Sequence, residues 1–303
     1  MSISTAYATL PMSIVTSPAG DGNAARLLIM AQQVRSPSTS WSHDMDWTRA
    51  HNAHRTNEVR EMAQAIRSDA NWFEGDVRVG PGGVPVMQHD PHDEAPRLTL
   101  EEWLAIGVTS GRGLKVELKE PAVFDAAVAA IERSGIEQSK LILNVPVAPV
   151  DPANGLSDEQ LRELRRRFPH ATINLSPTNQ SQYSSKVIAE LARTARLVGG
   201  RVMFPLEWSL VTDAVIGALR PFGKIAVWSS VWSGTPHDAV VATKHLRDRG
   251  VDGMVDLARA GGGERLVAAI ARSVGGWLGR PGEIRVGEAL HTIGDDLLRL
   301  LRG

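Results

Sequence analysis

The strongest constraint on the fold of this chain is an alternation of short apolar segments and helical patterns that begins near Asp46. Eight segments rich in apolar and β-branched residues are predicted strands: Trp47–Asn52, Trp72–Val79, Leu114–Lys119, Leu141–Val145, Thr172–Ser176, Val202–Glu207, Ile225–Ser229 and Gly253–Leu257. Helical patterns lie between and after them: Asn57–Ser68, Thr99–Ile106, Ala122–Ser134, Ser157–Phe168, Ser184–Leu197, Leu210–Leu219, Asp238–Arg249 and Arg265–Val274. Strands that alternate with helices predict βαβ units and a parallel sheet.

Eight such units are the number that closes an α/β (β/α)₈ TIM barrel, whose interior is filled by side chains. A barrel of roughly 200–250 residues forms one domain, so the 303 residues predict an N-terminal arm (1–42), a barrel (43–275) and a C-terminal helical extension (276–303). An open doubly wound sheet is the alternative, and it usually has a Gly-rich fingerprint after its first strand. The residues 52–55, Asn-Ala-His-Arg, do not match that fingerprint, so we favour the barrel.

The two terminal segments have distinct patterns. The first 42 residues mix Pro, Ser, Gly and Thr with one predicted helix from Gly22 to Val34, which Asp21 is placed to cap. Residues 283–301 carry an apolar stripe at helical spacing. We interpret it as a helix that covers the barrel, with a homodimer contact or a membrane-surface helix as alternatives.

Composition limits the compartment and the partners. A formal net charge of −1 provides no field that would attract nucleic acid or an anionic membrane. The absence of cysteine excludes disulfides, thiolate metal ligands and cysteine nucleophiles. Neither a secretory signal in Met1–Leu10 nor an apolar run of roughly 18–20 residues is present. We therefore predict a cytoplasmic protein with no membrane span and no nucleic-acid partner.

Carboxylates gather at the ends of the second and third predicted strands. Because strand side chains alternate with period two, Glu74 and Asp76 share one face, and Glu117 shares a face with Lys119. Carboxylates this close repel one another unless a cation neutralises them. Oxygen ligands without thiolate favour Mg²⁺ or Ca²⁺, with Mn²⁺ as a third candidate. Solvated carboxylates paired with neighbouring Lys and Arg side chains are the alternative, but their joint placement favours a metal site.

Two histidines precede or follow these carboxylates in strand order. His51 and His89 are the predicted acid–base residues, because an unperturbed imidazole titrates near neutral pH. His54 and His92 are close in sequence and rank second. Lys119 is the third predicted catalytic residue.

The turn after the eighth predicted strand runs from Ala258 to Arg265 and contains three successive glycines. Loops in this position of a barrel often bind phosphate through backbone N–H groups and a helix N-terminus. We therefore assign phosphate contacts to Arg259 and Gly262, with a flexible linker as the alternative. Further substrate contacts at or near strand ends are assigned to Asn52, Lys115, Asn144 and Trp228.

Three segments carry a resemblance to known proteins: Phe73–Val77 (FEGDV), Pro85–Asp90 (PVMQHD) and Val116–Lys119 (VELK). They resemble the glycerophosphodiester phosphodiesterases and the spider-venom phospholipase D toxins, and within that superfamily the menorin family is the most similar. The likeness extends over roughly residues 46–257. It implies a phospholipase-C-like phosphodiesterase barrel with metal ligands at Glu74, Asp76 and Glu117. It also implies catalytic histidines at His51 and His89, with Lys119 near the phosphate.

The resemblance is incomplete at four positions. The diesterases follow their first catalytic histidine with arginine, where this chain has Asn52 after His51. Menorin relatives usually have proline and aspartate where this chain has Asp90 and Glu117, and they tend to carry an arginine near Glu207. The last difference predicts a different substrate end.

Together these patterns predict a metal-dependent phosphodiesterase that hydrolyses or cyclises a small or lipid-like phosphodiester. In the predicted mechanism His51 activates the nucleophile or attacks phosphorus, and His89 protonates the leaving oxygen. A barrel that binds a phosphorylated ligand or a protein partner without turnover is one alternative. A metal-assisted lyase or isomerase is another, because barrels host many chemistries.

Overall fold

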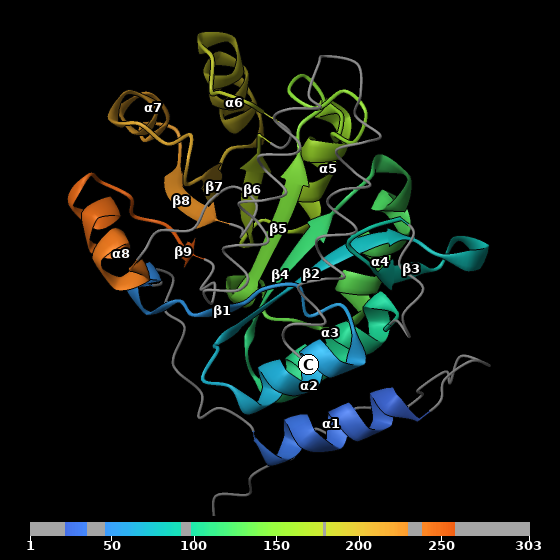
Figure 1. Ribbon diagram of the computed structural model, residues 1–303. Coiled ribbons are helices and arrows are strands. Elements are labelled where there is room, and N and C mark those ends of the chain that lie inside the picture. The colour runs from blue at the N-terminus through green and yellow to red at the C-terminus, as the bar shows by residue number, and fades with distance from the viewer. Residues whose placement is uncertain (1–21, 35–45, 92–97, 178–179, 230–237, 258–303) are drawn as a thin grey trace, which may run out of the picture.

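A computed structural model describes residues 22–34, 46–91, 98–177, 180–229 and 238–257. Eight parallel strands pair in the order β1-β2-β4-β5-β6-β7-β8-β9 and curve into a nearly closed barrel (Figure 1). Their bounds are β1 Asn52–Ala53, β2 Trp72–Val79, β4 Gly113–Leu118, β5 Leu141–Pro146, β6 Thr172–Ser176, β7 Val202–Glu207, β8 Lys224–Ser229 and β9 Val255–Leu257. The predicted (β/α)₈ architecture is confirmed.

Helices cover the outer side of the strands (Figure 1). Their bounds are α1 Asn23–Gln33, α2 Val59–Arg67, α3 Leu100–Ser110, α4 Phe124–Arg133, α5 Asp158–Arg167, α6 Ser185–Val198, α7 Asp213–Leu219 and α8 Ala239–Asp248. Several begin at side-chain caps: Thr99 and Ser157 each form a capping box, and Asp238 accepts from two backbone N–H groups of α8. No helix in the described ranges has the length and apolar character needed to cross a membrane.

Two local elements differ from the prediction. The first strand is only Asn52–Ala53, because Asp46 accepts a hydrogen bond from the Thr48 backbone N–H (3.0 Å) and starts a 3₁₀ turn over Trp47–Arg49 instead. A short strand β3 (Pro85–Met87), which we did not predict, pairs antiparallel with β2. The turn between them contains Gly82 and Gly83 at φ values of 67° and 80°, where a Cβ is disfavoured.

Strand alternation divides the side chains into an outer and an inner set. The outer set packs under the helices and includes Phe73, Val116 and Leu143. The inner set at the amino-terminal end of the barrel forms a separate apolar floor of Trp47, Trp72, Ile142, Met203, Ala226 and Met254. Because this floor fills one end of the lumen, the inward side chains beyond it lie at the carboxyl-terminal mouth, where barrel enzymes place their chemistry.

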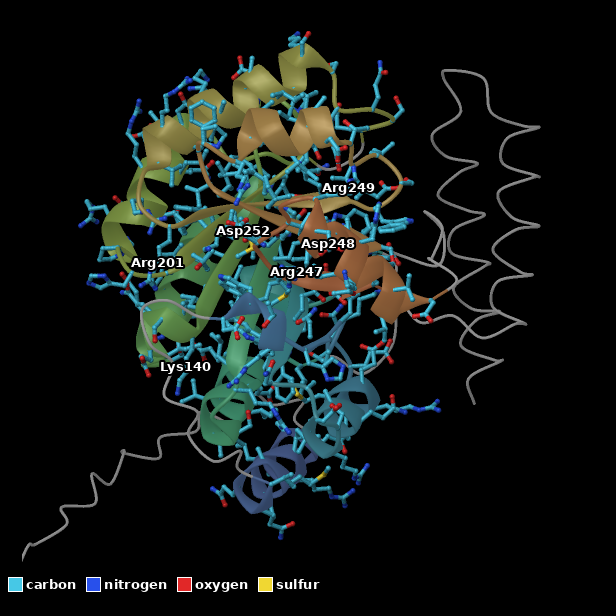
Figure 2. The ribbon with its side chains drawn as sticks, turned by 90° about the vertical axis from the view of Figure 1, so that its left-hand side faces the viewer. Lys140, Arg201, Arg247, Asp248, Arg249 and Asp252 are labelled. Atoms are coloured by element: carbon cyan, nitrogen blue, oxygen red, sulfur yellow. The ribbon has the colours of Figure 1, made fainter. Side chains whose placement is uncertain are left out.

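The barrel is closed between β9 and β1 by side chains. The pairing order ends at these two strands, and the Asn52 Nδ2 atom donates to the Asp256 Oδ2 atom (2.7 Å) across the seam. On the amino-terminal side Arg247 of α8 donates to the carbonyls of Val251, Gly253 and Trp47 at 2.9, 2.6 and 3.1 Å. Figure 2 shows Arg247 close to Asp252, which precedes β9 and accepts a hydrogen bond from the Ile225 N–H (2.9 Å).

The predicted N-terminal arm contains one described helix. The helix α1 coincides with the helix predicted from Gly22 to Val34. It buries Leu27 and Ala31 and lies beside α2 and α3 (Figure 1). Gly22 occupies its N-cap position, and the proposed cap Asp21 lies outside the described residues. Residues 258–303, which include the C-terminal extension, also lie outside them, so the predicted division of the chain stays a prediction.

Candidate functional site

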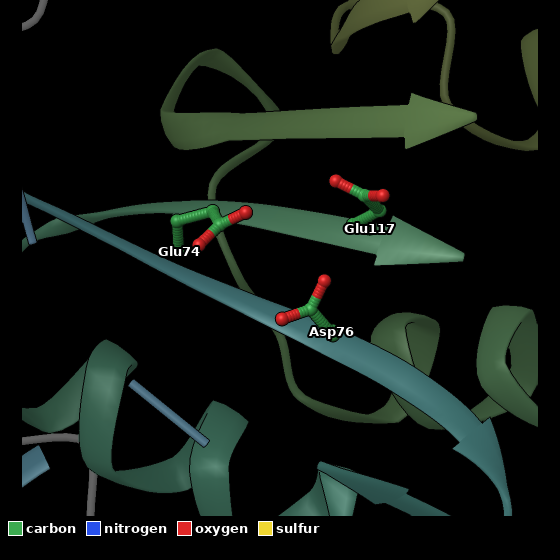
Figure 3. Close-up of side chains that lie close together, drawn as sticks. All are labelled: Glu74, Asp76 and Glu117. Atoms are coloured by element: carbon green, nitrogen blue, oxygen red, sulfur yellow. The ribbon is translucent and has the colours of Figure 1, made fainter. Parts of the chain in front are cut away.

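Three acidic side chains meet at the mouth of the barrel. Glu74 and Asp76 project inward from β2, and Glu117 projects from the neighbouring β4 (Figure 3). Asp76 and Glu117 are Cα partners in the ladder, and one carboxylate oxygen from each of the three residues lies within 4.8 Å of the others. We call these three residues the carboxylate cluster. The predicted convergence of Glu74, Asp76 and Glu117 is therefore present in the fold.

Two lysines of β4 and its extension neutralise part of the cluster. The Lys119 Nζ atom lies 2.9 Å from Glu117 Oε1 and 3.3 Å from Asp76 Oδ1, and the Lys115 Nζ atom lies 3.9 Å from Glu74 Oε1. Burial raises the pKa of Asp76 and Glu117, but Lys119 and the other neighbouring donors and cations together outweigh burial and hold both pKa values below their usual range. Glu74 is buried so deeply that its pKa rises despite His54 and Lys115. Of the three acids, Glu74 is therefore the one whose negative charge is least stabilised by the surrounding protein.

The donor set fits a hard divalent cation. Asn144 of β5 donates its Nδ2 to the Glu117 Oε2 atom (2.7 Å), and its own buried Oδ1 atom has no hydrogen-bond partner among the described residues. Three carboxylates and one unpaired amide oxygen are the ligand types that Mg²⁺, Ca²⁺ and Mn²⁺ prefer. The arrangement identifies no single one of these ions.

The first histidine at the site is His54, and the prediction that His51 lies beside the carboxylates is wrong. The His51 ring points away from the cluster and lies 3.1 Å from Asp69. Since Asn52 pairs with Trp72 of the inner floor, strand alternation turns Asn52 and His54 inward and His51 outward. The His54 Nδ1 atom lies 3.1 Å from Asp256 Oδ2 and 3.6 Å from Glu74 Oε2.

The environment of His54 favours its protonated form. Desolvation by the surrounding barrel lowers the pKa of the imidazole, but the charges of Glu74 and Asp256 outweigh it and raise the pKa to about 9. Burial raises the pKa of Asp256, but the hydrogen bond and charge of His54, together with Lys115 and Asn52, outweigh burial and hold the pKa below its usual value. The two residues therefore form an ion pair in the metal-free protein.

The second histidine, His89, lies on the other side of the cluster. Its Nδ1 atom is 3.0 Å from Asp90 Oδ1, and its carbonyl accepts a hydrogen bond from Arg78 Nε (2.8 Å). Burial raises the pKa of Asp76, and the charge of His89 acts with the larger effect of Lys119 to lower it. Unlike His51, this predicted histidine is held near the carboxylates by the β2–β3 hairpin.

Arg55 connects the two histidine regions. It has a φ of 57°, and no other non-glycine residue in the described ranges has positive φ. This conformation directs its backbone N–H to the Glu74 Oε2 atom (2.6 Å), while its guanidinium lies 3.5 Å from Asp90 Oδ2. Left-handed backbone is strained for a residue with a Cβ and is concentrated at functional sites. The pair His54-Arg55 also provides the His-Arg sequence that the diesterases carry and that His51-Asn52 lacks.

Sequence reasoning missed the residue that holds Asp76 in place. Asn57 Nδ2 donates to Asp76 Oδ2, and the Asp76 backbone N–H donates to Asn57 Oδ1, both at 2.8 Å. Asn57 is buried, and a Cβ at Gly75 would meet its Oδ1 atom at 3.2 Å and the Met87 Cε atom at 2.4 Å. The available signal was the polar run His54-Arg55-Thr56-Asn57 directly after the end of β1.

The remaining predicted contacts divide into three groups. Asn52, Lys115 and Asn144 lie inside the barrel, and Asn52 binds Asp256 rather than facing a free phosphate site. Trp228 lies on the inner side of β8, on the wall that faces the carboxylate cluster. Arg259, Gly262 and the alternative His92 lie outside the described residues.

Comparison with known proteins gives one family and several similar folds. The model of the Menorin N-terminal domain matches residues 46–246. The human protein FAM151B is 24% identical over 197 residues, which cover 60% of this chain and 71% of the human protein. Among solved structures, a protein described as a glycerophosphodiester phosphodiesterase from Galdieria sulphuraria is 14% identical with a TM-score of 0.49, covering 68% of this chain and 92% of its own. The glycerophosphodiester phosphodiesterase from Agrobacterium tumefaciens str. C58 is 16% identical with a TM-score of 0.45, covering 72% and 98%.

Proposed function

This chain belongs to the menorin family, and from that premise and the geometry of its barrel mouth we propose that it is a metal-dependent phosphodiesterase. Its substrate is a small or lipid-like phosphodiester. The observation that carries the proposal is the carboxylate cluster, three acids from two adjacent strands within 4.8 Å, flanked by one histidine on each side.

Glu74, Asp76 and Glu117 are the residues that would hold the metal. A divalent ion there would supply Lewis-acid chemistry, which offsets negative charge that builds on the phosphoryl oxygens in the transition state. Lys119 and Lys115 border the same space and neutralise non-bridging oxygens of the phosphate. The predicted phosphate contacts of Arg259 and Gly262 belong to the same proposal.

His54 takes the role that the sequence assigned to His51. Its Nδ1 atom is engaged by Asp256, which fixes the ring and leaves Nε2 to take a proton from the attacking hydroxyl or to attack phosphorus itself. Asp256 stabilises the imidazolium that forms. Glu74 is the largest of the causes that raise the pKa of His54, so a cation held by Glu74 would favour the neutral imidazole.

His89 is the proposed general acid. Asp90 holds its Nδ1 atom and Arg55 holds Asp90, so Nε2 is the atom that delivers a proton to the departing oxygen. A substrate with a hydroxyl group next to the phosphate would give a cyclic phosphate in place of a hydrolysed product. Phosphorus NMR of the products distinguishes these two reactions.

The test is a panel of phosphodiesters assayed with chelated protein and with added Mg²⁺, Ca²⁺ or Mn²⁺. We expect turnover only with metal, and a loss of most activity in Asp76→Asn. Asp69→Asn is the matched control, because Asp69 is an exposed acid that contacts His51 away from the site. Turnover that survives chelation, or that Asp76→Asn leaves intact, would overturn the proposal. We also propose a cytoplasmic location and a homodimer through residues 276–303, both of which were predicted from the sequence.

A further inference from the structure

The seam between β9 and β1 differs from the rest of the barrel. Every other neighbouring pair in the strand order is joined by a backbone ladder, whereas among the described residues no backbone hydrogen bond joins β9 to β1. Side chains therefore set the position of these two strands relative to each other. At the mouth Asp256 makes that contact, through Asn52 and His54. At the base of the seam, where the strands begin, the contact is made by Arg247 of α8 (Figure 2).

Arg247 joins the two sides of the seam with one guanidinium. Its Nη1 atom donates to the carbonyls of Val251 and Gly253, which lead into β9, at 2.9 and 2.6 Å. Its Nη2 atom donates to the carbonyl of Trp47, which leads into β1, at 3.1 Å. One side chain therefore fixes where both strands start.

Both ends of this bridge are themselves held in place. The Gly253 N–H donates to the Ile225 carbonyl of β8 (2.7 Å), and a Cβ at Gly253 would meet that oxygen at 2.8 Å and the Met203 Sδ atom at 2.9 Å. On the other side the Trp47 ring packs on Trp72 of β2, with the ring centroids 5.7 Å apart. The bridge thus connects β8 to β2 across the base of the seam.

A second arginine makes the same set of bonds elsewhere in the barrel. Arg165 of α5 donates from Nη1 to the carbonyls of Pro169 and Ala171, which lead into β6, and from Nη2 to the carbonyl of Arg201, which leads into β7. The two loop carbonyls lie four and six residues after Arg165, the same spacing as after Arg247. In both arginines the buried Nε atom has no hydrogen-bond partner among the described residues.

The two arginines differ in what else joins their strands. Between β6 and β7 a backbone ladder is present, and the Ile173 N–H donates to the same Arg201 carbonyl (2.9 Å) that Arg165 binds. The register of β6 and β7 is therefore kept by the ladder without Arg165. The strands that Arg247 connects have no ladder, so their relative position depends on it.

The position of β9 decides whether Asp256 reaches His54. Asp256 follows Gly253 by three residues of nearly extended chain, about 10 Å, so the two residues move together. The contact between His54 Nδ1 and Asp256 Oδ2 is 3.1 Å long. A displacement of β9 by about 0.5 Å takes it beyond the range of a hydrogen bond.

We propose that Arg247 is a positioning residue for His54: by bridging the base of the seam it keeps Asp256 within bonding distance of the imidazole at the opposite end of the barrel. Arg247 itself would touch neither substrate nor metal, because its contacts lie where the strands begin. The consequence for catalysis rests on the proposed function, but the positioning is measured without turnover.

The direct test follows the Nδ1 proton of His54 by ¹H–¹⁵N NMR in full-length, chelated protein, with the signal assigned by its loss in His54→Gln. A carboxylate only accepts, so Nδ1 carries the proton of the bond to Asp256, and that bond slows its exchange with water. We expect Arg247→Gln to accelerate this exchange by about tenfold or more, because the protecting bond is lost.

Arg247→Lys is a second variant that keeps the test decisive if Arg247→Gln fails to fold. Lysine can keep the bonds to Val251 and Gly253, both of which come from a single nitrogen, but it lacks the second nitrogen that reaches Trp47. We expect a smaller loss in Tm than in the glutamine variant and the same faster exchange at His54.

Arg165→Gln and Arg165→Lys are the matched controls, since they remove the equivalent bonds where a ladder remains. They should lower Tm and leave the His54 proton as protected as in wild type. Protection that survives in both Arg247 variants would overturn the inference. A loss of protection in Arg165→Gln as large as in Arg247→Gln would also overturn it, because the effect would then be general destabilisation.

Turnover separates this inference from the proposed function. In a phosphodiesterase, Arg247→Lys should lower kcat by about tenfold at unchanged KM, because the histidine is displaced while the substrate site is intact. Arg165→Lys should change neither constant. Loss of His54 protection in Arg247→Lys, in a protein that turns over no diester, would refute the phosphodiesterase and leave the positioning role standing. Turnover by wild type, with kcat and His54 protection unchanged in both Arg247 variants, would do the reverse.

Discussion

The Nδ1 atom of His54 lies 3.1 Å from the Oδ2 atom of Asp256, so a side chain beside the first strand meets one from the last strand across the seam of the barrel. The same carboxylate oxygen accepts from Asn52 at 2.7 Å. Closing the barrel and orienting a histidine at its mouth are therefore one interaction. Closure and the proposed catalytic role of His54 should respond together to mutation of Asp256.

The first prediction concerns pH in the metal-free protein. The pKa of His54 is raised from 6.5 to about 9 in the folded state, so its stabilising contribution is full below pH 6.5 and is lost as pH rises through 9. The free energy of unfolding of chelated protein should fall between pH 7 and 9.5, and His54→Gln should flatten that fall. Denaturant titrations at several pH values measure it. An equally steep fall in His54→Gln would assign the pH dependence to other groups.

The second prediction concerns Asn57, which touches Asp76 through two hydrogen bonds. Because residues that orient a metal ligand commonly contribute 10–100-fold to metal affinity, Asn57→Ala should weaken divalent-metal binding by roughly that factor. Calorimetric titration is the measurement. Gln64→Ala, which removes an exposed amide from α2, is the control and should leave the affinity unchanged. Unaltered affinity in Asn57→Ala would limit Asn57 to a role in folding.

The third prediction separates backbone strain from side-chain contact at Arg55. Both Arg55→Gly and Arg55→Ala lose the contact with Asp90, but only glycine tolerates a φ of 57° without strain. The glycine variant should therefore be more stable than the alanine variant by about 1 kcal/mol. Chemical denaturation compares the two. If the Arg55→Ala variant were as stable as the Arg55→Gly variant, or more stable, the left-handed backbone at this position would not be strained.

The fourth prediction assigns the two histidines. A general acid matters most when the leaving group is basic, so His89→Ala should lose roughly 10²–10⁴-fold on an alkyl diester and recover much of that rate on a nitrophenyl diester. His54→Ala should lose rate on both substrates alike. His51→Ala is the matched control and should behave as wild type, because its ring contacts Asp69 outside the barrel. If the nitrophenyl diester restored the rate of His54→Ala but not that of His89→Ala, His54 would be the general acid and His89 the base or nucleophile.

The sequence predicted the barrel and the carboxylate cluster because both depend on local periodicity. Period-two alternation fixes which residues of one strand share a face, and Glu74, Asp76 and Glu117 follow from it directly. The same alternation explains why His51 was placed wrongly. The turn capped by Asp46 moves the start of the first strand to Asn52, and alternation from that start turns the His51 side chain outward. The diesterases follow their first catalytic histidine with arginine, and in this chain only His54, followed by Arg55, matches that pair near the first strand. This match could have identified His54 as the histidine of the site.

Other parts of the site depend on contacts that no local pattern encodes. Asp256 is 202 residues from His54, and only closure of the barrel brings them together. The positive φ of Arg55 accompanies the hydrogen bond from its backbone N–H to Glu74, and no feature of the local sequence indicates this conformation. Asn57 is separated from Asp76 by the whole of α2 and is found only when the loop folds back onto β2.

The claim that Glu74, Asp76 and Glu117 form one metal site is tested most directly by calorimetric titration of Mg²⁺, Ca²⁺ and Mn²⁺ into chelated protein. We predict one ion bound per chain, an increase in Tm with bound metal, and the loss of both in Asp76→Asn. The exposed-acid variant Asp69→Asn should behave as wild type. Absence of binding by wild type at millimolar metal, or one-to-one binding that Asp76→Asn leaves unchanged, would contradict the claim.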